Sequence, residues 1–186
     1  MAIADKILRE LKLSQALVDV YRDGLGKESL TGVVTDFSDT LLYLSLFTDA
    51  GDANGISIVF RDDVTRMRWL GNERESIESL IQAAGSKPVR PRIVLDSIQS
   101  VLKGVAESFG YVNVLIERID DSMTFIGEIA ELDQDSLVLD AYGTFSTRDR
   151  SRLYLCCSDL TRVDADAAYE RSVALLARQA AGARSA

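Results

Sequence analysis

The sequence repeats itself at an offset of about 95 residues, and this repeat restricts the possible folds more than any other feature. Asp63-Val64-Thr65-Arg66 aligns with Asp159-Leu160-Thr161-Arg162, and similar matches extend over nearly the whole chain. Two copies of one folding unit are therefore expected. We predict a first domain at 1–86, a linker at 87–92 that contains both prolines, and a second domain at 93–186.

Hydrophobic periodicity predicts the same order of elements in each half: a helix, five strands and a helix. In the first half the predicted helices are 2–12 and 72–84, and the strands are 16–21, 30–37, 40–47, 56–60 and 64–69. In the second half the predicted helices are 93–108 and 165–181, and the strands are 111–119, 123–132, 135–142, 150–157 and 160–164. The expected fold class is mainly β with flanking helices (α+β).

Each half resembles the Sm-like family of small β-barrels. Gly32 and Gly127 match the glycine of that family's bent second strand, and Asp133 matches the acidic residue of the turn that follows. Arg61 matches the arginine of the family's second motif. The resemblance implies two tandem five-stranded Sm-like barrels, each preceded and followed by a helix. It also implies that strand edges pair between units to build oligomers.

The residues that bind uridine in that family are only partly present. Leu42 and Leu137 stand where the family has asparagine, and leucine cannot hydrogen-bond a base edge. Asp62 follows Arg61 where the family has glycine. The resemblance therefore favours the fold over the family's RNA-binding pocket.

Composition argues against several classes of function. The net charge of −8 disfavours a dedicated duplex-binding protein, because nucleic-acid affinity rests on neutralising phosphates. The chain has no histidine, so the commonest general base and metal ligand is missing. No apolar run approaches a bilayer-spanning length, and the N-terminal segment has no signal-peptide pattern. The adjacent Cys156 and Cys157 favour packing in a reducing compartment, so we expect a cytoplasmic protein with no membrane association.

The candidate binding residues are three arginines of the first half. Arg66 and Arg68 alternate along a predicted strand and so share a face, with Arg61 close by in sequence. They are candidates for contact with nucleic acid, although a salt-bridged rim is the competing interpretation. A second arginine group follows in the other half, made of Arg148, Arg150 and Arg152.

Acidic residues at the predicted turns are better explained by turn formation than by metal binding. They comprise Asp62, Asp63, Asp133, Asp135, Asp140 and Asp159. No catalytic residue, metal ligand or cofactor is predicted, and no phosphate-binding loop or nucleophile motif is present. We expect a non-enzymatic assembly or protein-interaction module that binds itself or another protein through barrel edge strands. The alternative is single-stranded RNA binding through Arg61, Arg66 and Arg68.

Overall fold

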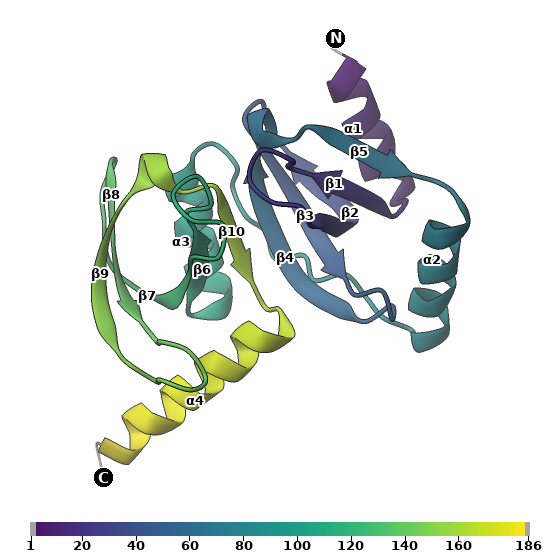
Figure 1. The fold of residues 1–186 in the computed structure, drawn as a ribbon. Helices are drawn as coiled ribbons and strands as arrows, with labels where there is room; N and C mark the ends of the chain where they lie inside the picture. The colour runs from purple at the N-terminus through teal and green to yellow at the C-terminus, as the bar shows by residue number, and fades with distance from the viewer. Residues whose placement is uncertain (1–2, 185–186) are drawn as a thin grey trace. The chain divides into compact units, whose positions relative to one another are not determined.

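The computed structural model describes residues 3–184, with side chains up to residue 180. The chain divides into two compact units, residues 1–90 and 91–186, shown in purple to blue and in teal to yellow in Figure 1. This division falls inside the proline-containing segment 87–92. Both units have the same order of elements: one helix, five strands and a second helix.

In the first unit, helix α1 (Ile3–Ser14) precedes five strands and helix α2 (Asn72–Ala84) follows them. The strands are β1 (Val18–Tyr21), β2 (Ser29–Phe37), β3 (Leu41–Phe47), β4 (Ala53–Phe60) and β5 (Arg66–Trp69). A 3-10 turn, η1 (Arg61–Asp63), separates the last two strands. These bounds agree closely with the helices and strands predicted for this half, except that residue 2 lies outside the described part.

The expectation of closed five-stranded barrels is wrong. Within the first unit the strands are antiparallel and lie in the order β5-β1-β2-β3-β4, as an open sheet. After η1 the chain places β5 beside β1, from Val18↔Trp69 to Tyr21↔Arg66, and not beside β4. Closure would need β4 and β5 to be neighbours, so the sheet of this unit stays open.

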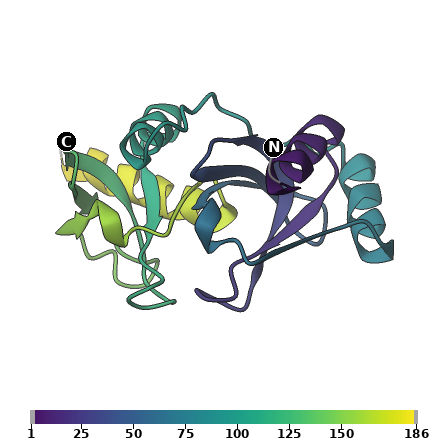
Figure 2. The ribbon, with the colours of Figure 1, turned by 90° about the horizontal axis from the view of Figure 1, so that it is seen from above.

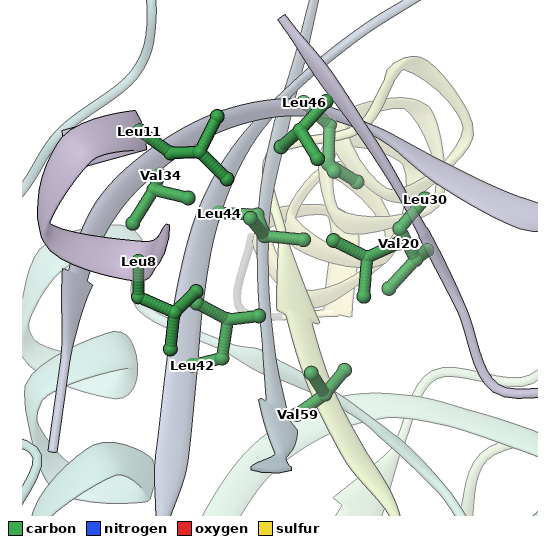
Figure 3. Close-up of a cluster of buried hydrophobic side chains, with 10 residues drawn as sticks. Leu8, Leu11, Val20, Leu30, Val34, Leu42, Leu44, Leu46 and Val59 are labelled. Carbon is green, nitrogen blue, oxygen red and sulfur yellow. The ribbon is translucent and has the colours of Figure 1, made fainter. Parts of the chain in front are cut away.

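The two helices of the first unit pack on opposite faces of this sheet. Leu8 and Leu11 of α1 join a core cluster that includes Val34 (Figure 3), whereas Ile77 of α2 packs with a cluster that includes Val33. Consecutive residues of a strand point to opposite faces, so each helix covers a different one. Figure 2 shows α1 and α2 as two separate coils beside the strands of the first unit.

The second unit repeats this plan. Helix α3 (Ile98–Phe109) precedes the strands, helix α4 (Ala168–Arg184) follows them, and a 3-10 turn, η2 (Cys157–Asp159), precedes the last strand. The strands are β6 (Val112–Leu115), β7 (Thr124–Leu132), β8 (Ser136–Ala141), β9 (Ser151–Cys156) and β10 (Arg162–Ala165). Their order is β10-β6-β7-β8-β9, again an open antiparallel sheet.

Helix α3 starts later than its predicted onset at residue 93. Ser97 is its N-cap, and the Ser97 hydroxyl accepts a hydrogen bond from the Ser100 amide. A capped start satisfies an amide that otherwise lacks a partner, which is why the helix begins here and not at the apolar Ile93.

The strand-two glycines allow neighbouring backbones to approach closely. A Cβ on Gly32 would come closer than 3.0 Å to the carbonyl oxygen of Ser45, and one on Gly127 would do the same to that of Asp140. Shortly after each glycine the pairing register shifts, between Val34 and Asp36 and between Ile129 and Glu131. In both units the glycine therefore lies where a side chain would not fit, shortly before an irregularity in the pairing of the second strand.

In the part of the chain that the structure describes, no helix is long and apolar enough to cross a membrane.

Substituting Gly127→Ala should lower the free energy of unfolding by about 1–3 kcal/mol, because the new methyl group would push against the β8 backbone. Gly24→Ala is the matched control, since a Cβ added there would meet nothing within 4 Å. Chemical denaturation followed by circular dichroism would measure both. Equal stability of the two variants would contradict the close approach.

Candidate functional site

The three candidate arginines do not form one cluster of free cations. Arg66 and Arg68 share a face of β5, as predicted, and each side chain is about half exposed. Arg61 lies in η1 and its side chain is mostly buried. Every one of the three contacts at least one carboxylate.

Arg61 fastens the turn after β4 to helix α1. Its guanidinium lies 2.6 Å from the Asp5 carboxylate and donates to the Ser38 carbonyl oxygen at 2.7 Å. It also lies over the Phe37 ring, 5.6 Å from the centroid. Through these contacts the planar guanidinium of Arg61 joins η1 to helix α1 and to the end of β2.

Arg66 is held between an acid and an aromatic ring. Its Nε and one terminal nitrogen both donate to the Asp23 carboxylate at 2.9 Å, while the guanidinium carbon lies 3.6 Å from the centroid of Tyr21. Hydrogen bonds from Arg66 and then Thr65 lower the pKa of Asp23 to about 2. The Asp23 carboxylate is therefore ionised at neutral pH and neutralises Arg66.

Arg68 belongs to a buried ionic network centred on Asp19. The Asp19 carboxylate is fully buried and binds Arg68, buried Arg74 of α2, and the Thr31 hydroxyl at 2.8 Å. Arg68 also contacts Glu73 at 2.8 Å. A buried charge needs such partners, so this network joins α2 to the sheet.

The duplicated Asp-x-Thr-Arg motif fastens the fifth strand of each unit to the first. The Thr65 amide and hydroxyl both donate to the Tyr21 carbonyl oxygen, and Thr161 makes the same two bonds to that of Leu115. Each threonine hydroxyl also lies within hydrogen-bond distance of an acid, Asp23 or Glu117, so its single proton is shared between the carbonyl oxygen and the carboxylate. We call this arrangement the threonine clamp; its role in both units is structural.

The second arginine group is also engaged. Arg152 donates to Asp140 through two nitrogens, at 2.7 and 3.0 Å. Arg150 donates to the Ala177 carbonyl oxygen and lies over the Tyr142 ring. Arg152 is thus neutralised by Asp140, whereas Arg150 is held by a carbonyl oxygen and an aromatic ring, which leave its positive charge in place.

A cavity of about 370 Å³ lies beside the arginines of the first unit. Its polar lining combines Arg61 and Arg66 with Asp39, Asp62 and Thr65, and Leu8, Leu42, Val64 and Met67 supply much of the apolar lining. The two acidic residues offset the two arginines, so the cavity has no strong preference for anions.

Aspartate side chains at the turns accept hydrogen bonds from backbone amides. Asp133 Oδ1 accepts hydrogen bonds from the amides of Asp135 and Ser136, at 2.8 and 2.7 Å. Among residues 3–180, no three acidic or cysteine side chains are arranged so that they could hold a metal ion.

Two strand edges remain available for pairing. Within the described chain, β5 pairs only with β1 and β9 only with β8, and both stand at the end of their strand order. On β9, Leu153 and Leu155 are half-buried and Tyr154 is 67% exposed. Met67 and Trp69 of β5 are half-buried as well. Apolar residues thus alternate along two open edges.

Sequence reasoning missed the buried partners of the arginines. Asp19 and Arg74 lie far apart in sequence and carry no motif, and only the pairing of β1 with β5 brings Arg68 beside Asp19. The one signal for Asp19 is a charged residue inside the otherwise apolar segment 16–20.

No family model, curated protein or solved structure matches this chain.

Replacing Asp19 by Asn should lower the free energy of unfolding by about 3 kcal/mol, because Arg74 would stay buried without its main counter-charge. The control is Glu75→Gln, an exposed acid in the first turn of the same helix, which should cost less than about 1 kcal/mol. Thermal or urea unfolding measures both. Similar losses for the two variants would show that Asp19 does not hold α2.

Proposed function

We propose that this chain is a non-enzymatic assembly module that joins copies of itself through the free edges of β5 and β9. The observation that carries the proposal is the open sheet of each unit, which leaves these two strands with one neighbour each in the described chain. An unpaired edge presents backbone donors and acceptors that another strand can satisfy.

A second copy is the partner that fits these edges. The two edges have different sequences, so β9 of one copy would pair with β5 of the next in a heterologous contact. Half-buried Leu153 and Leu155 on one edge and Met67 and Trp69 on the other would gain burial on pairing. Such contacts build closed rings or extended chains, depending on the rotation between copies.

Several observations support a role without catalysis in a reducing compartment. The sequence has no histidine, and the arginines that could bind substrate are engaged by carboxylates. Cys156 and Cys157 are free thiols, which suits the cytoplasm. The proposal retains the resemblance to the Sm-like family, which rests on Gly32 and Gly127, without the closed barrel.

Tyr154→Lys tests the assembly. A lysine on the β9 edge should oppose strand addition, because pairing would bring its charge into the new contact. Size-exclusion chromatography with light scattering should show a multimer for the wild type and a smaller mass for the variant. Leu175→Lys, at a position of α4 that is 57% exposed, is the matched control and should keep the wild-type mass. A wild-type monomer at every concentration would contradict the proposal.

Single-stranded RNA binding is the second candidate, and the cavity lined by Arg61 and Arg66 is the observation that favours it. The bound carboxylates weigh against it, because RNA would have to displace Asp5, Asp23 and Asp19 from their arginines.

If RNA binds there, affinity for an oligonucleotide pool should fall steeply between 50 and 200 mM salt, on the order of tenfold or more. Arg66→Ala combined with Arg68→Ala should abolish it. Fluorescence anisotropy measures both, and an unchanged anisotropy at 50 mM salt would eliminate this candidate.

A further inference from the structure

Three buried acidic side chains lie near one guanidinium where the last helix of the second unit begins. Asp164 lies on β10, Glu170 in the first turn of α4, and Glu117 after β6. Asp164 is 5% exposed and Glu170 3%, and the Glu117 side chain is also buried. We call these three residues the α4 acid group.

Arg162 is the cation of this group and is engaged mainly by Asp164. Its Nε donates to Asp164 Oδ1 at 2.8 Å and Oδ2 at 2.7 Å, and a terminal nitrogen lies 3.7 Å from Glu117. Two of the three acids thus contact the same guanidinium in a buried site. An ionised Glu170 would add a second negative charge near Asp164, with little solvent to screen the two.

Glu170 joins the helix to the sheet. One carboxyl oxygen accepts from the Asn113 amide of β6 at 2.7 Å, and the other accepts from the backbone amide of Ala167 at 3.0 Å. The second bond caps the N-terminus of α4. The same side chain thus holds the first turn of α4 and ties it to β6.

Further charged and titratable groups lie near the start of α4. The Asp166 amide donates to the Tyr111 hydroxyl at 3.1 Å, and Arg171 of α4 forms an ion pair with Asp166 at 3.6 Å. Arg171 is thus paired with another acid. Arg162 remains the cation whose charge acts directly to lower the pKa of Glu170.

The equivalent site of the first unit has the opposite charge pattern. The register of β1 with β5 and of β6 with β10 makes Asp19 equivalent to Asn113, and Arg68 equivalent to Asp164. In the aligned last helices, Arg74 stands where the second unit has Glu170. The first unit therefore ties its helix down with a buried ion pair, and the second with a carboxyl group beside another carboxylate.

Burial and then the neighbouring Asp164 raise the pKa of Glu170 from its ordinary 4.5 to about 7. The folded site therefore binds a proton more tightly than the unfolded chain does. Stability from this group is fully present below pH 4.5 and is lost as the pH rises through 7.

We propose that Glu170 is a proton-controlled latch on α4, which holds the helix against β6 and β10 when neutral and loosens it when ionised. The released proton goes to solvent. A loosened α4 would uncover the apolar surface formed by Tyr111, Ile126 and Tyr142, against which Val173, Ala174 and Ala177 pack. The latch concerns α4 and is independent of assembly through β5 and β9.

Hydrogen exchange of the intact protein, measured between pH 5 and 9 and corrected for intrinsic rates, tests the latch. The opening constant of α4 amides should rise roughly tenfold between pH 6 and pH 8 and level off above pH 8, as a shift in pKa from 4.5 to about 7 requires. Amides of α2 are the internal control and should show no such rise.

Three variants sharpen the test. Glu170→Gln should abolish the pH dependence of α4 opening, and Asp164→Asn should move it to lower pH by removing the neighbouring negative charge. Glu107→Gln, an exposed acid of α3, should keep the wild-type profile. The latch is refuted by a wild-type α4 opening constant that stays flat between pH 6 and 8, by an equal rise in α2, or by a Glu170→Gln variant with the wild-type profile.

Discussion

The threonine clamp is the interaction on which the architecture of both units depends. In each unit a threonine amide and hydroxyl donate to the carbonyl oxygen at the end of the first strand, so the short fifth strand is aligned with the first strand from its first residue. A four-residue strand makes few backbone hydrogen bonds, so the threonine bonds add substantially to what sets its register. The threonine clamp pairs the fifth strand of each unit with the first strand. Because the η1 and η2 turns separate the fifth strand from the fourth, each sheet stays open.

The polar residues beneath the final helix differ between units that otherwise share this scaffold. Duplicated positions hold an acid with two arginines in one unit and an amide with two acids in the other. Both arrangements place acidic or basic groups in the interior of the protein. A buried charge is costly unless it is paired, and an unpaired group becomes neutral instead. The two helices are thus held differently, one by buried ion pairs and the other by a carboxyl group whose pKa is raised by burial.

The sequence predicted the local features well. Periodicity located the ten strands and four helices of the described chain, and the glycines at 32 and 127 lie where neighbouring backbones approach closely. Closure of the sheet could not be predicted this way, since it depends on which strands become neighbours and not on the pattern within a strand. The arginines of β5 were visible, but their neutralisation by Asp19 and Asp23 depends on contacts more than 40 residues apart in sequence.

The proposed assembly depends on the outer edges of β5 and β9. The arginine face is neutralised from within the unit, whereas these edges keep backbone groups and half-buried apolar side chains available for another strand. Hydrogen exchange at several protein concentrations tests this most directly, because it locates pairing as well as detecting it. Amides of β5 and β9 should gain protection as concentration rises, while those of β2 and β7 should not change. Protection of β5 and β9 that is independent of concentration would contradict assembly through these edges.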